Sequence, residues 1–177
     1  MPHSQNVTCN DKIQYDLSLL NRVEIIATKK VVGKNVTLYR DFYQIKGDKN
    51  FDCSYIDKLH KQVKGNIPPK FRICGQLNTQ HNKYLVFNIW ENNKCLSWKD
   101  TQEYCELLGL TCVPVLWRGL YDISNITFAS FNTLTREGYV IRPSSSFLNT
   151  DFNKVVISNS PLDVNCHGII EFLKIYW

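Results

Sequence analysis

The chain has 177 residues and a mass of 20.6 kDa, about the size of one ordinary domain. Apolar residues make up 44% of it, and nine Tyr, nine Phe and four Trp exclude an intrinsically disordered chain. The net charge of +5 is compatible with a polyanionic partner. No apolar run approaches the roughly 20 residues that a membrane span needs, and no secretory signal is visible at the N-terminus. We therefore expect a cytoplasmic protein that does not bind membranes.

Seven cysteines and four histidines form no framework that a metal or a set of disulfides would require. No Cys-x-x-Cys pair occurs, and the histidines do not cluster with the cysteines. The pattern favours small buried thiols in a reducing compartment over a zinc site or a disulfide scaffold.

The N-terminal segment predicts two strands. Residues 11–20 are mixed in character and predict either a short helix or a turn. The β-branched stretches at 23–28 and 35–39 predict strands, and Gly33 lies between them. We expect these two strands to pair as a hairpin that turns around residues 32–34.

Residues 54–63 predict the first clear helix. Ser54 is the expected cap, with Asp57 three residues further on, and Gly65 ends the segment before two prolines. Two strands follow, at residues 71–75 and 84–90, and the second is almost continuously apolar.

A second helix begins after Ser97, which is its expected cap, and ends at Gly109. The expected apolar face of this helix consists of Tyr104, Cys105, Leu107 and Leu108. Short strands are predicted at residues 113–116, 137–142 and 154–157. The sum is an α+β fold of mostly antiparallel sheets with a few flanking helices.

Three segments stand in a definite order along the chain. The first contains Lys30, Gly33 and Asn35 in the pattern Lys-x-x-Gly-x-Asn; the second runs from residue 72 to 116; the third is Glu-Gly-Tyr-Val-Ile-Arg at 137–142. Together they resemble the ATP-dependent RNA ligase domain family, which belongs to the covalent nucleotidyltransferases. The resemblance runs from about residue 11 to 156 and then fades. It implies a single nucleotidyltransferase-like domain over residues 1–177, without a separate C-terminal domain.

The resemblance also implies a chemistry. In this family a lysine amine attacks the α-phosphate of ATP to form lysyl-AMP, and the AMP then activates an RNA 5′-phosphate for joining. Lys30 would be the catalytic lysine, ATP and Mg²⁺ the cofactors, and RNA ends the substrate. The nucleotide-binding residues would be Gly33, Asn35, Gln76, Glu137 and Arg142, and Glu137 would also serve the metal.

Several positions depart from the family pattern, among them Lys29 and Lys34, which stand where the family has acidic residues around the lysine. Val32 replaces an aspartate two residues after the lysine, Gln76 replaces a glutamate that holds the ribose, and Ser158 falls where a lysine contacts the α-phosphate. An amide keeps an acceptor and gains donors but loses the charge-assisted bond. A carboxylate from elsewhere, such as Glu24 or Asp41, would have to reach the Lys30 amine to compensate.

Two interpretations remain open at this point. The chain is an RNA ligase-like domain that binds ATP near Lys30 with impaired catalysis, or it is an inactive member, a pseudoenzyme that binds RNA or nucleotide or serves as a structural assembly partner of another protein. Residues that act as a unit in catalysis fail together, which favours impaired chemistry over full ligase activity.

Overall fold

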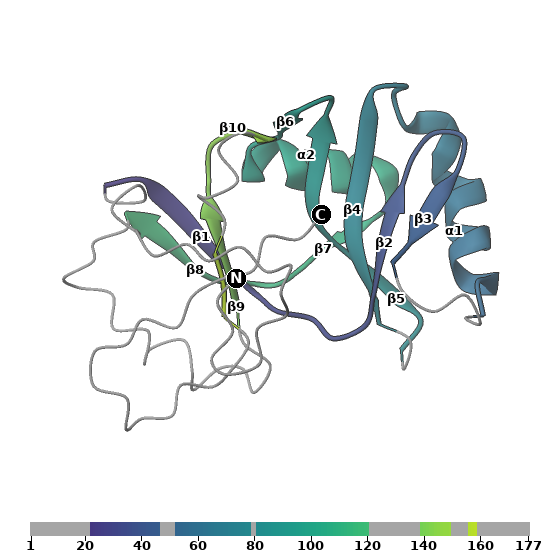
Figure 1. Cartoon of the computed structure of the whole chain (residues 1–177), viewed down its shortest axis with the longest axis horizontal. Helices are drawn as coiled ribbons and strands as arrows, with labels where there is room; N and C mark the ends of the chain where they lie inside the picture. The colour runs from purple at the N-terminus through teal and green to yellow at the C-terminus, as the bar shows by residue number, and fades with distance from the viewer. Residues whose placement is uncertain (1–21, 47–51, 79–80, 121–138, 150–155, 159–177) are drawn as a thin grey trace, which may run out of the picture. The chain divides into compact units, whose positions relative to one another are not determined.

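The computed structural model describes residues 22–46, 52–78, 81–120, 139–149 and 156–158 (Figure 1). The chain divides into two compact units, one drawn from Met1–Lys30 and Pro114–Trp177 and the other from Val31–Val113. Within the described residues, mostly antiparallel strands are combined with two α-helices, so the expected α+β class is confirmed.

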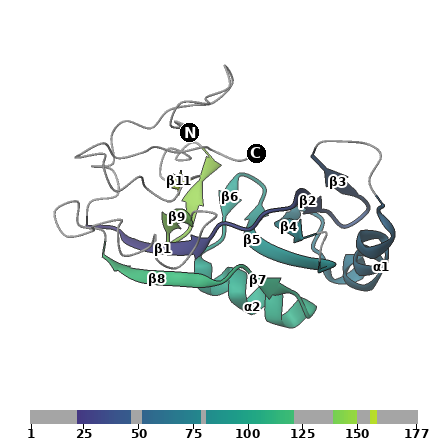
Figure 2. The same cartoon turned by 90° about the horizontal axis from the view of Figure 1, so that it is seen from below.

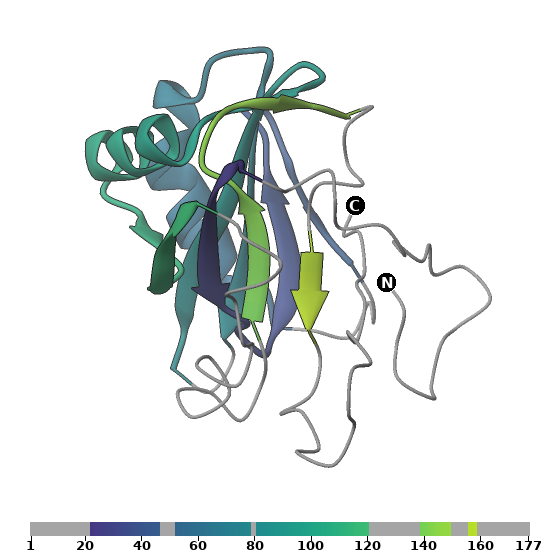
Figure 3. The same ribbon diagram turned by 90° about the vertical axis from the view of Figure 1, so that its left-hand side faces the viewer.

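The first unit contains an antiparallel sheet with the strand order β11-β9-β1-β8 (Figure 3). Its strands are β1 (Glu24–Lys29), β8 (Val115–Leu120), β9 (Tyr139–Pro143) and β11 (Val156–Ser158). The short strand β10 (Phe147–Leu148) follows β9 in the chain. Strand β1 lies inside the sheet, and Ile25, Ile26 and Ala27 are fully buried there. Its β-branched apolar residues suit a strand that is covered by neighbours.

The second unit is built on a sheet in which β6, β5, β4, β2 and β3 are neighbours in that order. The strands are β2 (Lys34–Leu38), β3 (Tyr43–Ile45), β4 (Phe71–Asn78), β5 (Lys83–Glu91), β6 (Lys94–Cys95) and β7 (Thr111–Cys112). Successive neighbours pair antiparallel, whereas β7 pairs parallel to β5.

Two helices cover one face of this second sheet: α1 (Ser54–Val63), which continues into the 3₁₀ turn η2 (Lys64–Asn66), and α2 (Trp98–Leu108) (Figure 2). Their buried residues join alternate residues of the strands in a single apolar cluster. That cluster includes Val36, Leu38, Ile56, Val63, Ile73, Leu77, Val86, Ile89 and Cys105. The opposite face of the sheet carries the intervening residues of each strand.

The expected hairpin between the first two strands is wrong. Strand β1 pairs with β8 and β9, whereas β2 pairs with β3 and β4 in the other sheet. The chain leaves the first unit after Lys30 and starts β2 at Lys34. Short sequence separation favoured a local pair between these strands, but β1 pairs with strands that are distant in sequence and β2 pairs with the strands that follow it.

The two helices match their predicted ranges, but the first is capped differently. Asp52 Oδ1, not the Ser54 side chain, receives the N–H of Ser54 at 2.9 Å. The second helix has the predicted cap, because Ser97 Oγ accepts from the Asp100 N–H at 3.1 Å. Gly109 ends it in the left-handed conformation, with φ of 65°.

Two further expectations need correction. Leu107 is 79% exposed and does not belong to the buried face of α2, which instead includes Trp98 and Thr101. The strand predicted at residues 113–116 is a junction: β7 ends at Cys112 and β8 starts at Val115. Pro114 has no N–H to donate to a sheet, which explains the break. The prediction for residues 11–20 lies outside the described residues.

Candidate functional site

Lys30 directly follows β1 and is the last residue of the N-terminal segment of the first unit. It is half-buried, and the residue before it is fixed by the backbone, because the Lys29 N–H donates to the carbonyl of Pro114 at 2.8 Å. Thr28 adds a side-chain bond from Oγ1 to the Val140 carbonyl at 3.4 Å. The strand that leads to the candidate lysine is therefore held from both neighbouring chain segments.

Ser158 lies in the same sheet as the strand that leads to Lys30. It pairs with Tyr139, and Tyr139 pairs with Lys29, so one row of the sheet crosses all three residues. Two strand spacings amount to about 10 Å. Ser158 is thus two strands away from Lys29, the residue before the candidate lysine.

In the second unit, Gly33 directly precedes β2. Its φ is +153°, and a Cβ atom at this position would overlap the carbonyl of Leu77, whose carbon would lie 2.7 Å away. Glycine is therefore required for both its conformation and its lack of a side chain. The close approach lets β2 start directly against β4.

Gln76 is bonded to that glycine. Its Nε2 atom donates to the Gly33 carbonyl over 2.6 Å. A carbonyl oxygen only accepts, so the partner must be the amide nitrogen, and a glutamate could not make this bond. The bond leaves the side-chain oxygen of Gln76 as an acceptor, without the negative charge of a carboxylate.

The segment between Lys30 and Gly33 connects the two units. Each of its ends is held by a hydrogen bond inside the unit to which that end belongs. The N–H of Lys29 is bonded before it, and the carbonyl of Gly33 is bonded at its end. Val32, in the middle, is 61% exposed. A segment fixed at both ends restricts where the lysine and its neighbours can move.

The remaining predicted residues divide between the units. Asn35 pairs with Gln76 across β2 and β4, so Gly33, Asn35 and Gln76 lie together. Arg142 lies on β9 opposite Ile26 and is 2% exposed. Its Nε donates to the Pro143 carbonyl at 3.2 Å, and its guanidinium lies 5.2 Å from the centre of the Phe147 ring.

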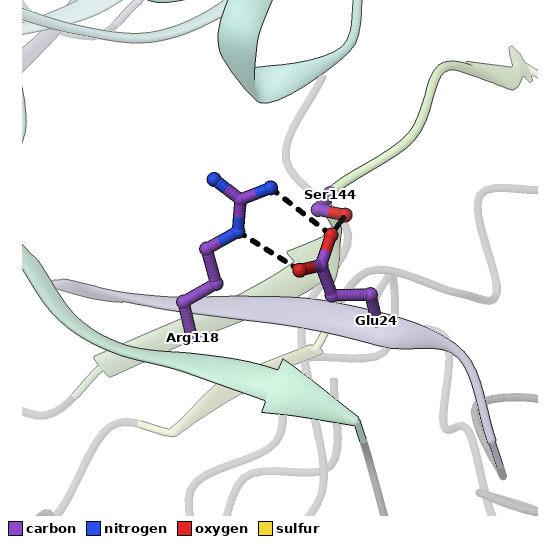
Figure 4. A network of polar contacts seen from close by, with 3 residues as sticks. All are labelled: Glu24, Arg118 and Ser144. Carbon is purple, nitrogen blue, oxygen red and sulfur yellow. Dashed lines mark hydrogen bonds and ion pairs between the residues drawn. The ribbon is translucent and has the colours of Figure 1, made fainter.

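Glu24 does not compensate for the carboxylates that the motif lacks. It lies at the end of β1 away from Lys30, where Arg118 Nε and Nη2 donate to its two oxygens at 3.0 and 3.1 Å (Figure 4). Ser144 Oγ donates to the same carboxylate. These bonds, first with Arg118 and then with Ser144, lower the pKa of Glu24. Lys30 lies six positions further along the chain, about 20 Å away.

The described residues do not assemble a metal site. Within those ranges, no group of three or more His, Cys, Asp or Glu side chains could hold a metal ion. Glu137, the predicted metal carboxylate, lies outside the described residues. Among the described cysteines, Cys95 and Cys105 are buried, and Cys53, Cys74 and Cys112 are half-buried. None of the helices in the described ranges has the length and apolar character to cross a membrane.

Comparison with known proteins decides the family. The sequence profile described as RNA ligase matches residues 23–157, most of the chain. The chain belongs to the RNA ligase family. The resemblance carried by the three motifs is therefore confirmed. A search of curated proteins found no match.

Solved structures of RNA ligases share the fold of this RNA ligase-family chain. An RNA ligase from Naegleria gruberi, determined with ATP and Mn, matches with a TM-score of 0.54 and 15% identity, covering 77% of this chain and 52% of its own. An archaeal ATP-dependent RNA ligase matches with a TM-score of 0.56 and 16% identity, covering 84% of this chain and 46% of its own. The chain spans about half the length of each.

Two contacts of the site were not predicted. The Pro114 carbonyl that fixes Lys29 carries no sequence signal, because any residue has a carbonyl. The bond from Gln76 to Gly33 had a signal, since replacing a carboxylate by an amide adds two donors. Its partner depends on the pairing of β2 with β4, which the sequence did not indicate.

Proposed function

We propose that this chain binds ATP beside Lys30 and is impaired in forming lysyl-AMP. The hydrogen bond from Gln76 to Gly33 is the observation that carries the proposal. It commits the amide nitrogen to the protein and leaves one neutral acceptor for a ribose hydroxyl. A charged acceptor is worth roughly twice a neutral one, so nucleotide binding is retained but weakened.

Two other departures weaken the reaction at the phosphate. Val32 presents an exposed apolar side chain where the family has a carboxylate beside the lysine. Ser158 has the strand position of the α-phosphate lysine but brings no cation to it. Charge that develops on a phosphate in the transition state is therefore less stabilised than in a complete site.

The rest of the proposal follows family chemistry. The divalent metal is Mg²⁺, with Glu137 as its candidate carboxylate, and the nucleotide-binding residues are Gly33, Asn35, Gln76, Glu137 and Arg142. RNA ends are the acceptors, and the protein works in the cytoplasm. The second candidate is an inactive family member that binds RNA or nucleotide or assembles with a protein partner, and the amide at Gln76 favours it too.

Labelled ATP tests the proposal. The purified chain is incubated with [α-³²P]ATP and Mg²⁺; bound nucleotide is measured at equilibrium, and covalent adduct is measured after denaturation. We expect ATP binding together with slow adduct formation that Lys30→Ala abolishes and Lys29→Ala, the adjacent lysine, preserves. Rapid stoichiometric adduct formation would contradict the impairment. Absence of ATP binding by the folded protein would contradict the nucleotide site and favour the second candidate.

A further inference from the structure

The turn between β2 and β3 carries two aromatic rings that no part of the proposed adenylylation site uses. The rings of Tyr39 and Phe42 are stacked, with centroids 4.4 Å apart and planes 17° apart. Phe42 is 51% exposed. Single exposed apolar residues are ordinary on protein surfaces, but a stacked pair holds a flat ring at a defined orientation.

The turn is held in place by hydrogen bonds. The Tyr39 N–H donates to the Phe42 carbonyl at 2.9 Å, and the Tyr39 hydroxyl donates to Gln44 Oε1 at 3.3 Å. His60, buried on α1, donates from Nε2 to the Tyr39 carbonyl over 2.7 Å, because a carbonyl can only accept. The ring of Tyr43 packs edge-on against His60, with centroids 5.6 Å apart. The exposed ring is thus pre-organised, which lowers the entropic cost of binding a flat ligand.

Charged residues lie close to the two rings along the chain. Phe42, Gln44 and Lys46 are exposed along β3 and its ends, whereas the intervening Tyr43 and Ile45 pack against the apolar cluster. Arg40 is exposed in the turn itself, beside Asp41. Lys46 is four residues beyond Phe42, about 13 Å along an extended chain. Arg40 and Lys46 therefore stand on either side of Phe42 along the chain, with Asp41 next to Arg40 and with Asp57 accepting from the Tyr43 hydroxyl at 2.7 Å.

We propose that this turn is a stacking platform for an unpaired base of single-stranded RNA, with Arg40 and Lys46 meeting the flanking phosphates. Every nucleobase has a π face that stacks on an aromatic ring, and the phosphates require nearby cations. Tyr39 is five residues along β2 from Lys34, about 17 Å. The platform thus holds the RNA strand at a distance from Gly33. The proposal rests on the proposed function only in taking RNA as the polymer.

Fluorescence anisotropy of a labelled single-stranded oligouridine of about a dozen nucleotides, bound to the full chain, tests the platform. One stacked base is worth about 5- to 100-fold in affinity, so Phe42→Ala should weaken binding by about tenfold. Phe42→Trp should bind the oligonucleotide about as well as wild type does, and the fluorescence of the added Trp should be quenched on binding. Phe42→Leu, which is apolar but not aromatic, should behave like Phe42→Ala. Arg40→Gln should reduce the slope of log K against log salt by about 0.7.

The matched control is Leu107→Ala, which removes an exposed apolar side chain from α2 and should leave RNA affinity unchanged. Circular dichroism confirms that each variant is folded. Binding by Phe42→Ala within twofold of wild type, an equal loss in Leu107→Ala, or no binding of the oligonucleotide by wild type would overturn the platform. ATP binding is measured in the same variants. If Phe42→Ala loses RNA affinity and still binds ATP, the platform is supported. If RNA binding depends on Phe42 but the protein binds no ATP, only the nucleotide site is refuted.

Discussion

Under the proposed function, the side chain of Gln76 serves both the fold and the nucleotide. Its amide nitrogen donates to Gly33, and its oxygen is left for the ribose. Gln76→Glu removes the donor that faces the Gly33 carbonyl and brings a carboxylate toward that oxygen. We expect the free energy of unfolding of the nucleotide-free protein to fall by about 1 kcal/mol. Saturating ATP should stabilise this variant more than it stabilises wild type, because a charged acceptor then meets the ribose. Thermal unfolding with and without ATP measures both effects.

Gln76→Ala is the control for that exchange, since it loses the same bond without gaining a carboxylate. It should show the loss of stability but no extra response to ATP. If Gln76→Glu were as stable as wild type without nucleotide, the bond to Gly33 would not be holding the segment.

Gly33 allows a backbone approach that no other residue could make. In Gly33→Ala the new methyl group would overlap the backbone of Leu77 at a φ of +153°. We expect a loss of at least about 2 kcal/mol in the free energy of unfolding, measured with urea. Gly65→Ala is the matched control, because a Cβ there would meet nothing within 4 Å. Equal effects of the two substitutions would show that the approach to Leu77 is not tight.

At the scale of elements, local signals predicted the helices and most strands, whereas strand partners needed the structure. Ser97 and Gly109 define α2 through bonds within a few residues, so the sequence contains the whole signal. The partners of β1 lie about 90 and 115 residues further along the chain, and no local pattern indicates them. Leu107 was misplaced because helical spacing alone does not show which side faces the sheet.

The end of β1 that carries Glu24 should respond to acid. Because Arg118 and Ser144 lower its pKa below the ordinary 4.5, Glu24 contributes stability above that value and loses it as pH falls through the lowered pKa. We expect the Tm of wild type to fall more steeply below pH 4.5 than the Tm of Glu24→Gln. The effect is small and decreases with added salt, since the pair is exposed.

Glu103→Gln provides the comparison for this acid response. Glu103 lies 3.7 Å from Lys99 on the surface of α2, and its carboxylate makes no bidentate pair with it. Its acid profile should follow that of wild type. A Glu24→Gln profile that follows wild type as well would mean that the bonds at Glu24 do not contribute to stability.

At the scale of the whole molecule, the sequence indicated which residues to examine but not the contacts that hold them. The motif identified Lys30, Gly33, Asn35 and Gln76, and the pairing of β2 with β4 places the last three together. The fixing of Lys29 by Pro114 depends on the chain returning to the first unit after more than 80 residues. Such contacts arise from tertiary pairing and not from residue type, so a motif cannot specify them.

Three of the departures should behave as one unit when they are reversed. Val32→Asp, Gln76→Glu and Ser158→Lys would each introduce one charge at a position where the resemblance implies a charged residue. Groups that stabilise the same transition state depend on one another, so each single reversal should change the rate of lysyl-AMP formation by no more than about twofold. The triple variant should gain about 100-fold or more, equivalent to roughly 3 kcal/mol of transition-state stabilisation.

The test measures the rate of adduct formation for all single, double and triple variants. The triple variant that also carries Lys30→Ala serves as the blank. A full gain from one reversal, or strictly multiplicative gains, would show that the charges act independently. A triple variant that binds ATP but gains no rate would show that the catalytic defect lies outside these positions.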